Sequence, residues 1–322
     1  LFLIMNQLRK EGTAIVYISH KLAEIRRICD RYTVMKDGSS VCSGMVSDVS
    51  NDDIVRLMVG RELQNRFNAM KENVSNLAHD TVFEVRNVTS RDRKKVRDIS
   101  FSVCRGEILG CSGRTELMNC LFGVDKRAGG EIRLNGKDIS PRSPLDAVKK
   151  GMAYITESRR DNGFFPNFSI AQNIAISRSL KDGGYKGAMG LFHEVDEQRT
   201  AEAQRELLAL KCHSVNQNIT ELSGGNQQKV LISKWLCCHP EVIIFDEPTR
   251  GIDVGAKAEI YKVMRQLADD GKVILMVSSE LPEIITVCDR IAVFCEGRLT
   301  QILTNRDDMS EEEIMAWALP HE

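Results

Sequence analysis

The order of hydrophobic and polar positions predicts a module of alternating strands and helices from about residue 81 onward. Residues 99–103 alternate apolar and polar side chains, as expected for a strand with one buried face. Residues 242–245 form a short apolar run with β-branched side chains, which is typical of a strand buried on both faces. Further strands are predicted at residues 83–88, 108–111 and 132–134, near Val273, and in an antiparallel pair over residues 291–303.

Helical spacing of apolar residues dominates the stretch from about residue 162 to 236, which predicts a helical subdomain. A long helix is expected over residues 227–237, and a short one over residues 311–319. Asn135-Gly136 follows a strand and predicts a tight hairpin turn. Strands that alternate with helices in this way indicate an α/β fold.

The chain also repeats itself at an offset of 259 residues. An ungapped match of this density indicates two fused copies of one module. The residues that recur 259 positions later are Met5, Gln7, Leu8, Gly12, Ile15, Ser19, Leu22, Glu24, Ile25, Cys29, Asp30, Arg31, Val34 and Gly38.

We therefore expect three regions. Residues 1–63 would be the C-terminal end of a first copy, residues 64–80 a polar linker, and residues 81–322 a second copy. The sequence opens with Leu1 in a helical pattern and lacks the body of the first copy. From this we expect an N-terminally truncated product or a partial sequence.

Composition narrows the class of protein. The 322 residues carry 44 Lys and Arg against 45 Asp and Glu, so the charge balance gives no support for nucleic-acid binding. The basic cluster at residues 91–97 is short and lies between two predicted strands, which favours a solvated hairpin loop over a binding patch. No run of 18 apolar residues is present. Ten cysteines without a Cys-x-x-Cys spacing favour free thiols in a reducing cytosol, and six scattered histidines suggest no zinc site.

Two carboxylates, Asp246 and Glu247, stand at the end of the buried run at residues 242–245, and Pro248 ends the strand. In an open α/β sheet, ligands bind at the carboxyl ends of the strands. A first carboxylate there is suited to Mg²⁺, and a second can orient or deprotonate an attacking water. An ordinary Asp-Glu-Pro turn is the alternative.

A Ser-Gly-Gly element, Ser223, Gly224 and Gly225, precedes the long predicted helix. Serine is a good N-cap, and glycines let backbone N–H groups approach an anion without a Cβ in the way. The helix N-terminus then favours a phosphate group. The alternative is a glycine-rich turn that only caps the helix.

These motifs resemble those of ABC transporter ATPases. Residues 222–228, Leu-Ser-Gly-Gly-Asn-Gln-Gln, are similar to the family's signature, residues 242–247 to its Walker B strand, and residues 251–253, which end in Asp253, to its D-loop. The two-copy layout and residues 113–117, 248–253 and 278–283 are similar to the ATP-binding subunits of bacterial importers of ribose, galactose and xylose. The resemblance implies an α/β P-loop NTPase fold of the ABC-cassette type, with a mixed sheet core, an antiparallel β subdomain and a helical subdomain.

The resemblance also implies a function. Such subunits bind and hydrolyse ATP with Mg²⁺ at the cytoplasmic face of the bacterial inner membrane. They attach to permease subunits that are fed by a periplasmic sugar-binding protein. Each nucleotide lies between the Walker motifs of one copy and the signature of the other. The signature residues Ser223, Gly224, Gly225 and Asn226 would therefore cap ATP held by a first copy. A homodimer of this chain is left as an alternative arrangement.

The phosphate loop departs from the family's pattern. About five residues are missing between Gly113 and Arg114 relative to that pattern, and Arg114 stands where Lys is usual. Thr115 retains a hydroxyl for Mg²⁺, and Glu116 follows it at the start of the helix. The missing backbone N–H groups would each contribute about 1.5–3 kcal/mol to phosphate binding. We expect weak nucleotide binding here.

Two further positions are assigned by the resemblance. His20 corresponds to the family's switch histidine, and Ser279 stands at the same place in the second copy; a satisfied loop histidine is the alternative for His20. Glu157 lies where the family's Q-loop couples nucleotide to permease, with an exposed charged turn as the alternative.

Three functional hypotheses follow. The first is the ATPase subunit of a sugar importer, with Glu247 as its catalytic carboxylate. The second is a module that docks on a permease or partner without hydrolysing ATP. The third, a soluble ABC protein of translation or DNA repair, would need long charged insertions or a coiled coil, and the sequence has neither.

Overall fold

The computed structural model describes residues 2–18, 22–36, 39–49, 80–182 and 194–319. The chain divides into two units: Met70–Ile252 with Glu259–Glu322, and Leu1–Ala69 with Asp253–Ala258. Among the described residues, no helix is long and apolar enough to cross a membrane.

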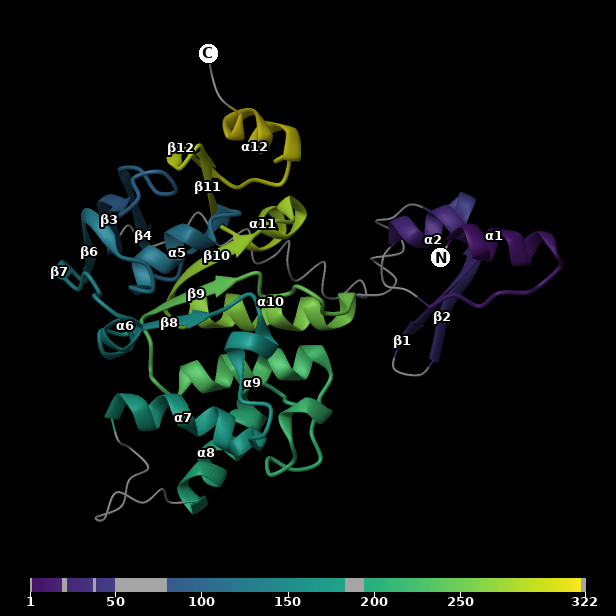
Figure 1. Ribbon diagram of the computed structural model, residues 1–322, viewed down its shortest axis with the longest axis horizontal. Helices are drawn as coiled ribbons and strands as arrows, with labels where there is room; N and C mark the ends of the chain where they lie inside the picture. The colour runs from purple at the N-terminus through teal and green to yellow at the C-terminus, as the bar shows by residue number, and fades with distance from the viewer. Residues whose placement is uncertain (1, 19–21, 37–38, 50–79, 183–193, 320–322) are drawn as a thin grey trace. The chain divides into compact units, whose positions relative to one another are not determined.

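The larger unit is built on a six-stranded sheet in the order β12-β11-β5-β10-β9-β8 (Figure 1). The β11–β12 pair is antiparallel and the other neighbouring pairs are parallel. Its strands are β5 (Ile108–Ser112), β8 (Met152–Ile155), β9 (Val242–Asp246), β10 (Val273–Ser278), β11 (Arg290–Cys295) and β12 (Arg298–Thr304). Every residue of β9 and β10 is buried, as the apolar run predicts for central strands.

A second sheet of four antiparallel strands, in the order β4-β3-β6-β7, packs with the first. The predicted hairpin turn is confirmed, because Asn135 and Gly136 both have positive φ between β6 and β7. The basic segment 91–97 joins β3 to β4 as a mostly exposed loop. The strands are β3 (Thr81–Ser90), β4 (Ile99–Cys104), β6 (Arg127–Leu134) and β7 (Lys137–Asp138).

One hydrophobic core joins the two sheets through helix α5 (Thr115–Phe122). It contains Phe83 of β3, Leu117 of α5 and Leu275 of β10. The remaining helices against the sheets are α6 (Pro144–Lys149), α10 (Val254–Asp269), α11 (Leu281–Val287) and α12 (Glu311–Ala318). The fold is therefore α/β with a mixed sheet and an antiparallel β subdomain.

The helices α7 (Ile170–Asp182), α8 (Glu194–Leu207) and α9 (Gly224–Leu236) lie together on one side of β8 and β9 (Figure 1). They have their own hydrophobic core, which includes Ile174 of α7, Ala201 of α8 and Leu231 of α9. The turns that lead into them are η3 (Arg159–Gly163) and η4 (Ile219–Glu221). These helices form a group with a core of its own beside the sheets.

The smaller unit repeats the C-terminal elements of the larger one at the same offset of 259 residues. Its described elements are α1 (Phe2–Lys10), α2 (Leu22–Ile28), β1 (Arg31–Lys36), β2 (Ser39–Met45) and η1 (Val46–Asp48). The bounds of α2, β1 and β2 coincide with those of α11, β11 and β12 when 259 is added. The register shift between Val34 and Met35 recurs between Val293 and Phe294. The predicted repeat thus extends to the irregularities of the strands.

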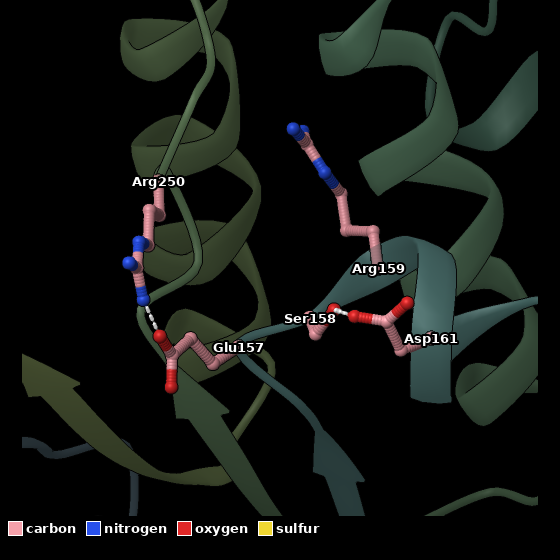
Figure 2. Close-up of a pocket in the computed structure, with 5 residues that line it drawn as sticks. All are labelled: Glu157, Ser158, Arg159, Asp161 and Arg250. Atoms are coloured by element: carbon pink, nitrogen blue, oxygen red, sulfur yellow. Dashed lines mark hydrogen bonds and ion pairs between the residues drawn. The ribbon is translucent and has the colours of Figure 1, made fainter.

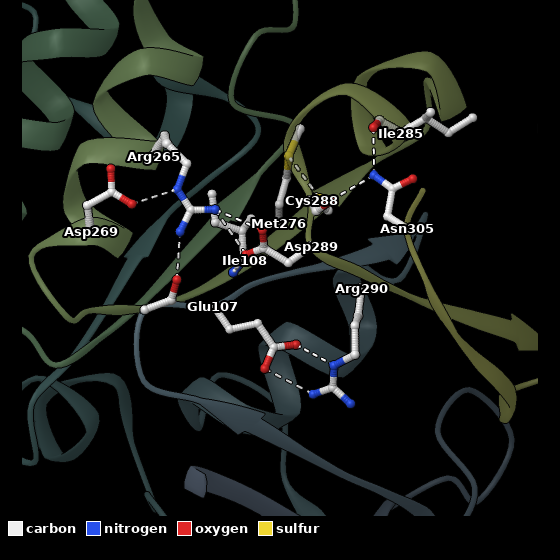
Figure 3. Close-up of polar contacts among 11 residues, drawn as sticks. Glu107, Ile108, Arg265, Asp269, Met276, Ile285, Cys288, Asp289, Arg290 and Asn305 are labelled. Carbon is white, nitrogen blue, oxygen red and sulfur yellow. Dashed lines mark hydrogen bonds and ion pairs between the residues drawn. The ribbon is translucent and has the colours of Figure 1, made fainter. Parts of the chain in front are cut away.

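A buried ionic network fastens α10 to the strands (Figure 3). The guanidinium of Arg265 donates to both carboxylate oxygens of Asp289, at 2.9 and 3.0 Å, and to the carbonyl of Gly106 at 2.7 Å. The carboxylate of Asp289 also accepts the N–H of Ile108 at 2.7 Å. Burial raises the pKa of Asp289, and the charge of Arg265 opposes that rise.

We expect Arg265→Met to lower the free energy of unfolding by about 3 kcal/mol, because it leaves a buried carboxylate without its cation. The raised pKa of Asp289 means that its stability contribution is lost as pH rises through that pKa. The loss of unfolding free energy in Arg265→Met should therefore be larger at about pH 8, where the carboxyl is more fully ionised, than at about pH 5. Urea unfolding at both pH values measures it. Arg265→Met with Asp289→Asn is the control and should be less destabilised; equal losses would contradict the charge argument.

Candidate functional site

The site is centred on Asp246, the last residue of β9 and 1% exposed. Its Oδ1 accepts the hydroxyl of Thr115 at 2.9 Å, and its Oδ2 accepts the hydroxyl of Tyr154 at 2.7 Å. Thr115 is the first residue of α5, so the carboxyl end of β9 and the N-terminus of α5 meet here. Burial raises the pKa of Asp246, while the two hydroxyl donors oppose that rise. A buried carboxylate beside a threonine hydroxyl is a suitable donor set for Mg²⁺.

Because burial raises the pKa of Asp246, ionisation of this carboxyl destabilises the folded chain when no ligand is bound. The stability that this carboxyl contributes is present below its unfolded pKa and is lost as pH rises through the raised pKa. Asp246→Asn should therefore melt at a higher temperature than the natural chain at pH 8, by about 2–4 °C. The difference should shrink toward pH 4, roughly the ordinary range of a carboxyl pKa. Thermal unfolding at the two pH values tests this, and a lower melting temperature at pH 8 would contradict it.

Glu247 follows Asp246 in a strained conformation, with a φ of 48°. Its N–H donates to the carbonyl of Val277 at 2.9 Å, which holds the turn against β10. One carboxylate oxygen, Oε1, accepts the N–H of Ser279 at 2.7 Å. Burial raises the pKa of Glu247, and the bonds from Ser279 oppose that rise. The structure thus brings Glu247 together with Ser279, the position assigned to the switch of the second copy.

The phosphate loop consists of Gly113 and Arg114 alone, between the end of β5 at Ser112 and the start of α5 at Thr115. The N–H of Gly113 donates to the carbonyl of Ser278 at 3.2 Å. The guanidinium of Arg114 donates to the carbonyl of Phe294 at 3.5 Å. Both groups are therefore engaged with the protein itself. The residues present fit a metal ion at Asp246 and Thr115, but they do not form a cradle for a triphosphate.

The signature residues lie at the N-terminus of α9. Ser223 occupies the predicted N-cap position and is exposed, but its hydroxyl accepts the side-chain amide of Asn226 at 3.0 Å instead of a backbone N–H. The helix begins at Gly224, three residues before the predicted start, so Gly224 and Gly225 form its first turn. The side-chain oxygen of Asn226, Oδ1, accepts the backbone N–H of Lys211 at 2.9 Å. Ser223 therefore lies on the surface of the unit, at the N-terminus of α9.

Glu157 lines a cavity of about 510 Å³ with Ser158, Arg159, Asp161 and Arg250 (Figure 2). Glu157 forms an ion pair with Arg250, which follows the Walker B region. Arg159 extends away from this pair and donates to the carbonyl of Gly224 at 2.9 Å and to that of Gly251 at 3.2 Å. The segment at the predicted Q-loop is thus tied both to the signature and to the loop after β9.

Among the described residues, Glu116 and Asp253 form no hydrogen bond with Asp246. The side chain of Glu116 forms an ion pair with Lys95 at 3.7 Å. Asp253 accepts the N–H of Ala256 at 2.9 Å and so caps the start of α10. His20 lies outside the described residues.

Sequence reasoning missed Tyr154 and Arg159. Tyr154 precedes the predicted Q-loop in the apolar run of β8, and a tyrosine in a strand buried at every position needs a partner for its hydroxyl. That requirement is the only signal in the sequence, and it does not identify Asp246 as the partner. Arg159 lies two residues after Glu157, and no pattern in the sequence distinguishes it from the charged residues beside it.

Comparison with known proteins gives the fold and the similarity of the sequence. A model of the ABC transporter family matches residues 96–250. The fold resembles that of a nucleotide-free ATP-binding cassette from an ABC transporter, with a TM-score of 0.62 and 19% identity over 73% of this chain and 95% of that one. A cassette called cbiO1 from Clostridium perfringens gives a TM-score of 0.60, with 21% identity over 74% of this chain and 94% of that one. The fold is that of an ATP-binding cassette.

The chain is similar in sequence to the ATP-binding proteins of ABC transporters for simple sugars. It is 96% identical to the D-allose import ATP-binding protein AlsA of Escherichia coli over all of its own length and 64% of that protein. It is 43% identical to the ribose import ATP-binding protein RbsA of Bacillus cereus over 99% of its own length and 63% of that protein. The chain therefore spans less than two thirds of these relatives. The first match runs over 327 residues, five more than the chain contains, which equals the predicted shortening of the phosphate loop.

Proposed function

We propose that this chain is the ATP-binding part of a bacterial importer of simple sugars, with D-allose as the sugar transported. The observation that carries the proposal is the 96% identity to the D-allose import protein along the whole chain. The pairing of Thr115 with Asp246 at the end of β9 supports it, because a metal ion that accompanies ATP needs such donors.

The predicted site residues other than Ser279 have roles in this proposal. Asp246 and Thr115 hold Mg²⁺, which would supply charge neutralisation for the phosphates, and Glu247 orients an attacking water. Gly113, Arg114 and Glu116 lie beside the nucleotide. They bind it weakly because the loop is short. Ser223, Gly224, Gly225, Asn226 and Asp253 face a nucleotide held by a first cassette, where His20 serves as the switch. The exposure of Ser223 supports this role.

The partners follow from the same proposal. Permease subunits in the bacterial inner membrane bind the cassette at its cytoplasmic face, and a periplasmic sugar-binding protein delivers the sugar to them. Glu157 and the cavity around it transmit the state of the nucleotide site to the permease. The contacts of Arg159 with Gly224 and Gly251 support this, because one side chain joins three functional loops. A dimer of the chain is not required.

The test uses a graft in which this chain replaces the matching part of the Escherichia coli D-allose import relative. The graft is made with its natural phosphate loop and with a five-residue glycine-rich loop inserted after Gly113. Uptake of labelled D-allose is measured in cells that lack the relative. We expect uptake from the restored graft and reduced uptake from the natural one. Absence of uptake from both, with normal protein levels and normal membrane association, would overturn the proposed function.

A further inference from the structure

The two oxygens of the Asp246 carboxylate have different surroundings. Oδ2 accepts the hydroxyl of Tyr154 of β8 at 2.7 Å, and both side chains are buried. The ring of Tyr154 packs edge-on against that of Phe122 of α5, with the ring centroids 5.3 Å apart. Because a buried phenol holds it, Oδ2 lies in the interior of the unit, between β8 and α5.

The other oxygen of this carboxylate, Oδ1, lies on the side of the phosphate loop. It accepts the hydroxyl of Thr115, the first residue of α5, at 2.9 Å in a part-buried position. Gly113 and Arg114 immediately precede Thr115 and join it to β5. A ligand that enters at the phosphate loop therefore meets Oδ1, while Oδ2 is held in the wall behind it.

The position of the Tyr154 hydroxyl is fixed by the sheet. β8 and β9 are paired in parallel with Tyr154 opposite Ile244, two residues before Asp246. A second acceptor, Oδ1 of Asn119, lies 3.2 Å from the same hydroxyl. A phenol has one hydrogen to donate, and the shorter distance and the charge of the carboxylate favour Asp246 over Asn119. The Asp246 carboxylate is therefore held from both sides and cannot turn without breaking a hydrogen bond.

We propose that Tyr154 is a positioning residue that makes the site select Mg²⁺ over Ca²⁺, given that the proposed function makes Asp246 a metal ligand. With Oδ2 held by Tyr154, the carboxylate offers one oxygen. Mg²⁺ demands a near-ideal octahedron and keeps several waters or phosphate oxygens beside one or two carboxylates. Ca²⁺ takes about six to eight oxygens in a flexible geometry and commonly binds both oxygens of a carboxylate. A carboxylate that cannot turn therefore disfavours Ca²⁺.

The probe is Mn²⁺, a paramagnetic ion that suits the same oxygen donors as Mg²⁺ and Ca²⁺. Mn²⁺ bound to the full chain without nucleotide is measured by electron paramagnetic resonance, and Mg²⁺ or Ca²⁺ is added to displace it. The part of the bound Mn²⁺ that Asp246→Asn abolishes reports the site. Tyr154→Phe should lower the preference for Mg²⁺ over Ca²⁺ by about tenfold or more, because loss of a hydrogen bond to a metal ligand typically changes metal affinity by roughly 10–100-fold.

Two further variants separate metal selection from a general loss of structure. The matched control is Tyr261→Phe, which removes the hydroxyl of another buried tyrosine, one that donates to Glu283. It should keep the preference within about twofold of the natural chain. Asn119→Ala removes the competing acceptor, so the hydroxyl of Tyr154 is left with Asp246 alone. This variant should keep or strengthen the preference for Mg²⁺.

Three outcomes would overturn the proposal. The first is that Asp246→Asn binds as much Mn²⁺ as the natural chain. The second is an unchanged preference in Tyr154→Phe, or an equal fall in Asn119→Ala. The third is loss of cooperative thermal unfolding in Tyr154→Phe, which would make the hydroxyl a requirement of the fold. None of these measurements involves sugar uptake, so uptake by the graft with an unchanged metal preference would remove the role of Tyr154 alone.

Discussion

Insertion of a five-residue glycine-rich loop after Gly113 should raise the affinity of the chain for ATP with Mg²⁺ by roughly a thousandfold. In the natural chain, Gly113 and Arg114 are the only residues between β5 and α5. The N–H of Gly113 is directed to Ser278 and the guanidinium of Arg114 to Phe294. Two or three restored charge-assisted bonds to phosphate would supply about 4–6 kcal/mol. Titration calorimetry of the two purified chains measures the difference.

The control for this experiment is the same insertion between Asn135 and Gly136, in an exposed turn far along the chain from the phosphate loop. This variant should bind as weakly as the natural chain. Asp246→Asn in the restored chain should bind ATP with less dependence on Mg²⁺, because the metal loses its carboxylate. If the natural chain binds ATP in the micromolar range, the proposed effect of the short loop is wrong.

Local patterns were sufficient for much of the fold. The run at residues 242–245 ends in two carboxylates, and the structure places Asp246 at the carboxyl end of a central strand. The repeat at 259 residues was visible in identities alone, and the element bounds follow it. These features are encoded within one strand or within a fixed offset. They do not depend on which elements become neighbours in the fold.

The contacts that shape the site depend on those neighbours. Tyr154 reaches Asp246 because β8 pairs with β9, although 92 residues separate the two along the chain. Arg159 reaches Gly224 and Gly251 across 65 and 92 residues. No periodicity specifies such pairs, since many hydroxyl and carbonyl groups could satisfy a tyrosine or an arginine. Even Ser223, at its predicted N-cap, bonds to a neighbouring side chain in place of the backbone.

The site also carries a cost that its proposed role explains. Asp246 is buried, its hydrogen-bond partners within the described part of the chain are two hydroxyl groups, and burial raises its pKa. Glu247 holds a positive φ that a residue with a Cβ adopts rarely. Strain and buried charge at adjacent positions are expected where a ligand supplies the compensation. Thermal unfolding of Asp246→Asn tests the effect of the buried carboxylate on stability, and the loop insertion tests the affinity for ATP.

Glu247→Gln should reduce ATP hydrolysis by about a thousandfold in the graft with a restored loop while leaving ATP affinity unchanged. The burial that raises the pKa of Glu247 brings it closer to neutral pH, which suits a carboxylate that accepts a proton from water. A glutamine keeps an oxygen that can accept the N–H of Ser279, so the turn should keep its shape. Phosphate release and ATP titration on the same preparation separate catalysis from binding.

The matched control is Glu241→Gln, an exposed carboxylate that precedes the other end of β9 and pairs with Asn135. It should hydrolyse ATP at the rate of the parent graft. Loss of binding in Glu247→Gln would indicate that the side chain supports the loop and not the reaction, because a change in affinity is a ground-state effect. Undiminished hydrolysis with normal affinity would remove Glu247 as the catalytic carboxylate. Asp246 would then be the only acidic group at the end of β9 left to carry that role, and its hydrogen bonds to Thr115 and Tyr154 would have to rearrange for it to reach a water.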